Sequence, residues 1–309
     1  MPEIYDIYYD ESQEESYWHG FLLVPRSSRQ YLLDLLIKAK RNIGFANPIS
    51  FKDIRRLDTT RRKRAALVES WTSIALSAIQ QQKFLVLPTP FHLGGKNYAR
   101  LDNPIRCKFV IFKERDKHKK MFYGLNELEC IETTFRMGLK GGIHRLFCED
   151  DPITVGNVFI EGDKHYIRQF GRQFDVRRSL RRFVNEKRNY VEFLKDSKLI
   201  PQKSDPHKIK LSQRPDDSEL LQLCDILIGG VRFHSYCPSI YNIKYKISFP
   251  CRELLTRPQD NLPRMKQSRF HNGFILNQAW IESDSWNFTT LEPKEPQEYG
   301  KFEQLQLPL

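Results

Sequence analysis

Residues 216–233, DDSELLQLCDILIGGVRF, predict a capped amphipathic helix that is led by acids at its positive N-terminal end. Asp225 interrupts the apolar middle of this helix, where it lies between Cys224 and Ile226. A carboxylate in such a place is partly desolvated, and it costs free energy unless it is paired or bound to a metal ion. Asp225 is therefore the most informative residue of the sequence.

A line of small or polar residues follows the predicted helix through Asp225. Gln222 lies at i−3, Ser218 at i−7 and Gly229 at i+4, whereas the other faces carry Leu and Ile. A polar line that faces a sheet indicates a functional site. The alternative is structural, because Asp225 can instead pair with a buried Arg or mark the solvent edge of the helix.

The rest of the chain alternates between strands and helices after an opening hairpin. The expected strands are 4–10, 17–25, 84–88, 106–113, 153–162 and 209–212, and the expected helices are 28–41, 60–82, 126–139 and part of 164–190. This order predicts a mixed α/β sheet flanked by helices.

Prolines break the pattern from residue 248 onward. We therefore expect one α/β domain over residues 1–247 and an irregular C-terminal extension over 248–309, which wraps the core or binds a protein partner. On this division, a chain that ends at Tyr245 should stay folded.

Two more acids end predicted strands, Asp10 in the first strand and Glu161 in VFIE. Carboxylates from separate elements that meet at one point can hold the hard Mg²⁺ ions that catalyse phosphodiester hydrolysis. Each acid alone has an ordinary explanation, since Asp10 can open a solvated loop and Glu161 can precede a turn at Gly162. Only convergence with Asp225 makes them a predicted site.

Three short motifs resemble the domain-of-unknown-function 3800 family: IYYDES at residues 7–12, VFIEGD at 158–163 and LLQLCDILIGG at 220–230. They occur in the family's order, and the resemblance covers about residues 4–236. It implies a ribonuclease-H-like fold with an acidic site. The stretch ISFKDI looks like the part of that family that carries an early lysine, which here is Lys52.

The resemblance implies that Asp10, Glu161 and Asp225 hold two Mg²⁺ or Mn²⁺ ions, one activating a water and one stabilising the leaving oxygen. Glu161 stands where the family has an aspartate, so Asp163, two residues further on, remains an alternative metal ligand. Glu11 is expected to orient a metal-bound water, and Lys52 is expected to neutralise phosphate charge in the transition state.

The chain carries 50 Lys and Arg against 38 Asp and Glu, a net charge of +12, which predicts an anionic partner. The surplus lies in three segments, 52–64, 106–120 and 164–190, and in the last of these Arg alternates with aromatic residues. The arginines expected to contact DNA or RNA are Arg172, Arg177, Arg178, Arg181 and Arg182. The alternative is a solvated helix face whose aromatic residues belong to the core.

These observations predict a metal-dependent nuclease, in a bacterial or phage-defence context, that hydrolyses DNA or RNA. The alternative is a non-catalytic nucleic-acid-binding subunit or scaffold with a degenerate site. The six cysteines are widely spaced, so we expect reduced thiols and no zinc site. The N-terminus lacks a basic start followed by an apolar core, and we expect a cytoplasmic protein.

Overall fold

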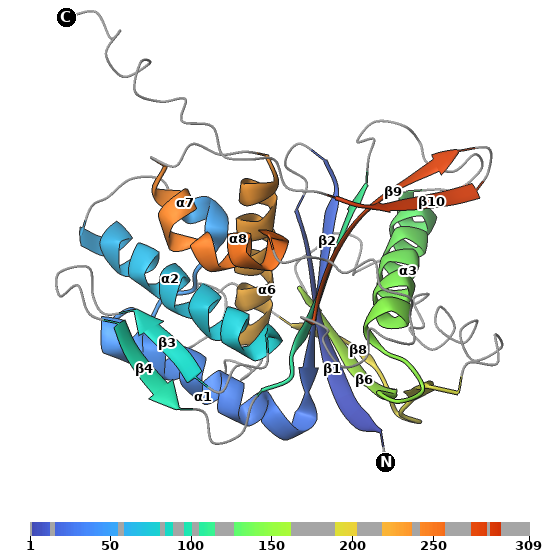
Figure 1. The fold of residues 1–309 in the computed structure, drawn as a ribbon, viewed down its shortest axis with the longest axis horizontal. Coiled ribbons are helices and arrows are strands. Elements are labelled where there is room, and N and C mark those ends of the chain that lie inside the picture. Colours follow the sequence, from blue (N-terminus) through green and yellow to red (C-terminus); the bar gives the residue numbers. More distant parts are fainter. Residues whose placement is uncertain are drawn as a thin grey trace, which may run out of the picture.

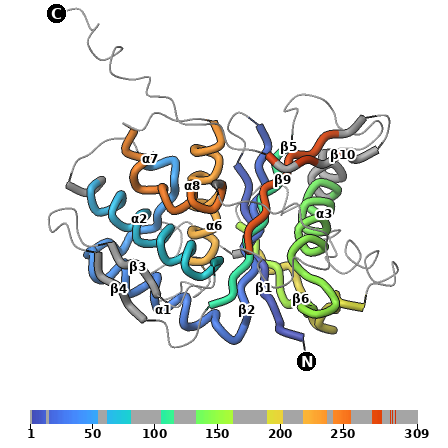
Figure 2. Tube along the Cα trace, viewed as in Figure 1, coloured from blue at the N-terminus to red at the C-terminus, as the bar shows by residue number. Residues whose placement is uncertain are grey.

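The computed structural model describes twelve stretches of the chain. The described residues are 2–12, 16–54, 59–80, 84–88, 96–100, 105–114, 127–161, 189–202, 218–236, 242–256, 273–282 and 285–291. Figure 1 shows how their helices and strands are arranged, and Figure 2 traces the same path as a tube.

A curled, mixed sheet forms the centre of the molecule (Figure 1). Seven strands follow one path in the order β10-β9-β5-β2-β1-β6-β7, and β8 also pairs with β6. Their bounds are β1 Glu3–Ser12, β2 Trp18–Pro25, β5 Lys108–Glu114, β6 Ile153–Glu161, β7 Val191–Phe193, β8 Leu199–Gln202, β9 Phe274–Glu282 and β10 Ser285–Thr290. A separate hairpin is formed by β3 (Phe84–Pro88) and β4 (Lys96–Arg100).

Strand direction changes at β1. On one side, β1 and β2 form the antiparallel hairpin that the sequence predicts, and β5 pairs antiparallel with β2. On the other side β6 is parallel to β1, and β7 and β8 are parallel to β6. Parallel pairing puts the carboxyl ends of β1 and β6 at the same edge of the sheet.

Helices cover both faces of the sheet, which explains why the central strands are apolar on both sides (Figure 1). One face packs against α1 (Arg26–Ile43), α2 (Thr59–Ile79), α6 (Ser218–Ser235), α7 (Ile243–Ile247) and α8 (Phe249–Thr256). The other face packs against α3 (Glu127–Leu146). We call these the α6 face and the α3 face.

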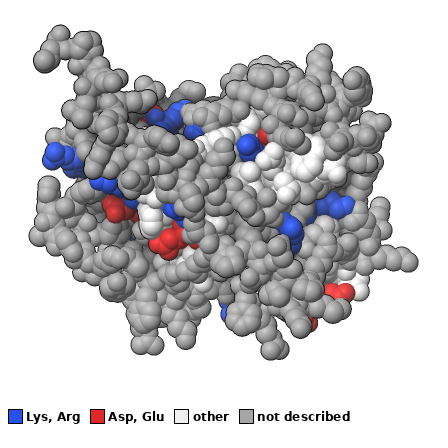
Figure 3. Space-filling view, turned by 45° about the horizontal axis from the view of Figure 1, so that its top comes forward, with Lys and Arg blue, Asp and Glu red and all other residues white. Residues whose placement is uncertain are grey.

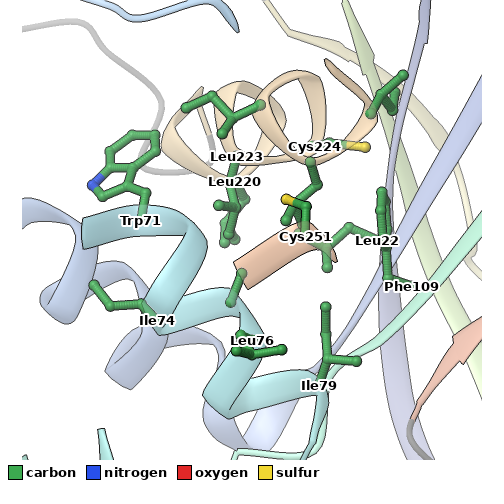
Figure 4. Close-up of a cluster of buried hydrophobic side chains, with 14 of the residues drawn as sticks. Leu22, Trp71, Ile74, Leu76, Ile79, Phe109, Leu220, Leu223, Cys224 and Cys251 are labelled. Carbon is green, nitrogen blue, oxygen red and sulfur yellow. The ribbon is translucent and has the colours of Figure 1, made fainter. Parts of the chain in front are cut away.

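Each face has its own hydrophobic core. Beneath α6, side chains from the sheet and from several helices interlock, including Leu22 from β2, Trp71 from α2 and Cys251 from α8 (Figure 4). Alternate residues of β1 belong to different cores, since Tyr8 lies on the α6 face while Tyr9 lies on the α3 face. Successive residues at the end of β1 are therefore directed to opposite sides.

Glycines allow both helices to approach the sheet closely. A Cβ at Gly20 of β2 would lie 2.3 Å from Ile228 Cγ1 of α6, and one at Gly142 of α3 would lie 2.5 Å from Val110 Cγ2. The expected end of this helix at residue 139, just before Gly141 and Gly142, is therefore wrong. Helix α3 continues to Leu146 because Gly142 provides the space for Val110.

The expectation of an irregular C-terminal extension is also wrong for residues 249–256 and 274–290. Helix α8 packs in the α6-face core, and β9 pairs in parallel with β5 over Phe274–Ala279. The apolar start of β9 is buried on both faces, because Phe274 and Leu276 enter one core and Ile275 the other. A division at residue 247 stays a prediction.

The remaining sequence expectations have mixed outcomes. The mixed α/β class is confirmed, whereas β4, β7 and β8 were not expected from the sequence. The expected elements at 209–212 and 164–188 lie outside the described residues. Of the helices in the described ranges, none is long and apolar enough to cross a membrane.

Candidate active site at the carboxyl end of β1

Asp10 and Glu161 end two neighbouring parallel strands. The register pairs Tyr8 with Phe159 and Tyr9 with Ile160, so Asp10 and Glu161 occupy the next adjacent positions. The rings of Tyr8 and Phe159 stack on the α6 face with centroids 4.9 Å apart. Because side chains alternate along a strand, Asp10 and Glu161 are directed to that same face.

Cys224 joins the third acid to this region. Its thiol donates to the backbone oxygens of Tyr8 and Gly20, at 3.4 and 3.6 Å. Gly20 is the register partner of Asp10. Helix α6 is therefore seated directly over the carboxyl end of β1, and Asp225 is the next residue along this helix.

The pKa of the Cys224 thiol depends on the carboxylates of both Asp10 and Asp225. Burial is the main cause that raises the pKa of the Cys224 thiol well above its ordinary value, and the negative charges of Asp10 and then Asp225 raise it further. Both acids thus act on one buried sulfur. Their effect also keeps this thiol protonated and uncharged.

Asp225 has a backbone partner. Its Oδ2 atom accepts a hydrogen bond from the Phe51 N–H at 3.0 Å. One turn earlier, Gln222 Oε1 accepts from the Ile49 N–H at 3.0 Å, and the Phe51 ring occupies the space that a side chain at Gly229 would need. The polar line of α6 therefore faces the segment 49–51 and holds its backbone, so the expectation that it faces the sheet is wrong.

One partner of Asp225 is thus a main-chain N–H, while its side chain is half-buried, and the two structural alternatives for this acid stay open. An acid–arginine pair occurs at another site, at Asp6 of β1. The buried carboxylate of Asp6 accepts from Arg26 Nε at 3.0 Å and from the Asn157 N–H at 2.8 Å. Asp6 is thus a structural acid that links β1, α1 and β6.

Lys52 follows Phe51 in the short 3₁₀ helix η1 (Phe51–Asp53). The bond between Phe51 and Asp225 holds this turn against α6, while the Lys52 side chain is exposed. The structure therefore brings Lys52 to the region of Asp225 through the backbone, even though the two residues are far apart in the sequence.

The base of α6 is anchored by a buried ion pair that sequence analysis missed. Lys40 Nζ of α1 lies 3.1 Å from Glu219 Oε1, and both side chains are almost fully buried. Ser218 Oγ donates to the other oxygen of Glu219 at 2.9 Å. In the sequence, the only local sign of this ion pair is that a lysine follows Ala39 on the apolar side of α1. The pair orients α6 and so positions Asp225.

Glu11 lies on the α3 face, next to Asp10 in sequence but directed away from it. Its Oε2 accepts from the Tyr9 hydroxyl at 3.0 Å. The same hydroxyl lies 2.8 Å from His19 Nδ1, and His19 Nε2 lies 2.8 Å from Glu114 Oε1. Sequence analysis missed this buried chain, and the metal-orienting role of Glu11 stays a prediction.

Several predicted site residues cannot be placed in this arrangement. Those outside the described residues are Asp163, Arg172, Arg177, Arg178, Arg181 and Arg182. On the face drawn in Figure 3, the described Lys and Arg side chains lie at separate places, with acidic side chains between some of them.

The donor set suits a hard cation, because Asp10, Glu161 and Asp225 offer only carboxylate oxygens. Within the described ranges, however, no three His, Cys, Asp or Glu side chains are grouped closely enough to form a metal site. The acids come from three elements and share one neighbourhood, but their oxygens do not form a ready-made three-ligand cluster.

No protein-family model, no curated protein and no solved structure matches this chain.

Proposed function

We propose that this chain is a metal-dependent phosphodiester hydrolase of DNA or RNA, with its active site at the carboxyl end of β1. The observation that carries the proposal is the position of Cys224. Its thiol bonds to the backbone beside Asp10, and its pKa responds to Asp10 and Asp225 together. Glu161 ends the adjacent parallel strand, next in register to Asp10.

The sheet supports a ribonuclease-H-like core as part of this proposal. Three antiparallel strands, β5, β2 and β1, are followed by strands parallel to β1 on its other side. Helix α6 crosses the end where the acids lie. Such an arrangement brings carboxylates from two strands and one helix toward a common point, as the resemblance of the three motifs implies.

In the proposed reaction, Asp10, Glu161 and Asp225 hold Mg²⁺ or Mn²⁺, which supplies an activated water and stabilises charge on the leaving oxygen. The Cys224 thiol donates to the backbone oxygens of Tyr8 and Gly20, which leaves carboxylate oxygens as the ligands for a hard cation. The exposed Lys52 is suited to neutralise phosphate charge.

The direct test is cleavage of labelled single- and double-stranded DNA and RNA by the purified full chain. We expect cleavage with Mg²⁺ or Mn²⁺ and little turnover with Ca²⁺, whose looser coordination positions the attacking water poorly. Asp10→Asn and Asp225→Asn should each lower the rate at least ~100-fold, because each removes a metal-binding charge. Asn at 225 retains an oxygen for the Phe51 N–H, so the fold should survive.

A matched control is Asp196→Asn, which removes an exposed acid after β7 and should leave the rate unchanged. Circular dichroism checks that every variant is folded. Full activity in excess chelator, or wild-type activity of Asp225→Asn, would contradict the proposal. Binding of nucleic acid without cleavage by the wild-type chain would instead favour the scaffold alternative.

A further inference from the structure

An exposed aromatic ring with a lysine beside it lies at the C-terminal end of α6. Tyr236 follows the helix directly, and 38% of its surface is exposed, whereas most large apolar side chains of the described residues are buried. Its ring meets the buried Trp18 edge to face at 6.0 Å between centroids. Lys113 Nζ lies 5.0 Å from the centre of the Tyr236 ring and 5.4 Å from that of Trp18.

The charge of Lys113 is held by rings and not by an acid. Among the described residues, no carboxylate lies within 4 Å of its Nζ, so the cation is attracted by the two aromatic faces alone. Trp18 Nε1 is a second unusual group, since it is buried and has no hydrogen-bond partner in the described part of the chain. Buried polar groups are normally paired, so this donor needs an explanation.

This cluster lies on the same face of the sheet as Asp10. Trp18 pairs with Ser12 and with Lys113, two residues beyond the row that pairs Asp10 with Gly20. Lys113 is also two strands away from β1, which corresponds to about 12 Å between the Cα atoms of Asp10 and Lys113. A polymer bound at the acids could reach Lys113 and Tyr236 within a few monomer units.

We propose that Tyr236 and Lys113 bind a single-stranded segment of the nucleic acid, with a base stacked on Tyr236 and a phosphate at Lys113 Nζ. The inference rests on the proposed function in taking nucleic acid as the ligand. Stacking on one exposed ring needs a base that is free of its own neighbours, and a single strand provides this while a duplex does not. The contact tolerates every base, since each has a π face.

Binding is measured in chelator, with no cleavage, by the anisotropy of fluorescent single-stranded and duplex oligonucleotides. Tyr236→Ala should weaken single-strand binding roughly 5- to 150-fold, which corresponds to the loss of one base–aromatic stack. Tyr236→Phe should retain it. Lys113→Gln should reduce the slope of log affinity against log salt by about 0.7, as expected for one phosphate contact to a single strand.

The matched controls are Tyr31→Ala and Lys38→Gln on α1. Tyr31 is 40% exposed, close to the value for Tyr236, and Lys38 is an exposed lysine of the same helix. Both variants should bind as the wild type does. A base analogue such as 2-aminopurine should be quenched on binding to wild type and Tyr236→Phe, but not on binding to Tyr236→Ala.

Wild-type affinity of Tyr236→Ala, or an equal loss in Tyr31→Ala, would overturn the assignment. Tighter binding of duplex than of single strands would overturn it as well. Because the assay needs no turnover, a chain that binds single strands through Tyr236 but cleaves nothing would refute the proposed hydrolase and leave this contact standing.

Discussion

Two neighbouring residues of β1, Asp10 and Glu11, place their carboxylates in contrasting surroundings on opposite faces of one sheet. On the α3 face, Glu11 belongs to a chain of side chains that continues through Tyr9 and His19 to Glu114. On the α6 face, the charges of Asp10 and Asp225 both raise the pKa of the Cys224 thiol. Because side chains alternate along β1, Glu11 joins a polar network on one face, whereas Asp10 adds to the negative charge on the other face.

The difference teaches what each face can do. On the α3 face both carboxylates have a side-chain partner, since Glu11 accepts from the Tyr9 hydroxyl and Glu114 lies 2.8 Å from His19 Nε2. On the α6 face the field of two acids extends to a neighbouring thiol, and a bound cation would relieve it. For this reason we assign the proposed chemistry to the α6 face.

The largest expected effect tests how far the α6 face depends on the end of the chain. Its core includes six buried residues that follow Tyr245: Ile247, Cys251, Leu254, Leu255, Phe274 and Leu276. The five Ile, Leu and Phe side chains together contribute roughly 8–15 kcal/mol of burial, which is comparable to the whole stability of a domain. A chain that ends at Tyr245 should therefore fail to fold, contrary to the sequence-based expectation.

Circular dichroism and thermal melting of the shortened chain check this, with a chain that ends at Leu291 as the control. The control should melt cooperatively. A cooperative melt of the chain that ends at Tyr245 would show that β9 and α8 are additions to a complete core.

The next effect compares two buried histidines of the described residues, one on each side of the sheet. His19 has a partner at each ring nitrogen, whereas His234 Nε2 lies 3.1 Å from Ser248 Oγ and its Nδ1 has no partner within the described residues. Burial, with a smaller effect of Arg252, lowers the pKa of His234 from 6.5 to about 4.

Between these two pH values the unfolded chain binds a proton at His234 that the folded chain does not. The free energy of unfolding should therefore be unaffected above pH 6.5 and fall as the pH drops, by up to ~3 kcal/mol at pH 4. Urea titrations at pH 7, 5.5 and 4.5 measure this slope. His234→Asn should flatten it relative to wild type, and identical slopes would exclude His234 as the cause.

The smallest effect concerns how α6 is seated over Asp10. Gly20→Ala places a methyl group against Ile228 and should cost about 1–3 kcal/mol of stability, because the helix must shift or Ile228 must change its rotamer. The control is Gly141→Ala on α3, where the added carbon meets nothing within 4 Å. That variant should be more stable by about 0.5–1 kcal/mol, since Ala is the better helix former.

Urea denaturation of both variants at neutral pH gives these two values. If Gly20→Ala is neutral, then the close approach of α6 to β2 is not needed to hold Asp225 over the end of β1.

Local pattern was sufficient to predict the elements that carry the site. Short runs rich in apolar and aromatic residues indicated β1, β2 and β6, and helical periodicity indicated α1, α2 and α6. The three acids were predicted because each breaks an apolar pattern or ends it. Such signals are readable because strands that are buried on both faces form short continuous apolar runs, whereas burial on one face of a helix repeats about every 3.6 residues.

Long-range contacts decided the rest. Three contacts join residues that are distant in the chain. Strand β9 pairs with β5, Gly142 of α3 packs against Val110, and the Phe51 N–H donates to Asp225. No local pattern encodes such partners, because a glycine or a short apolar run has the same appearance whatever packs against it. The sequence by itself thus determined which residues could form a site, and only the tertiary structure decided which face each of them shares.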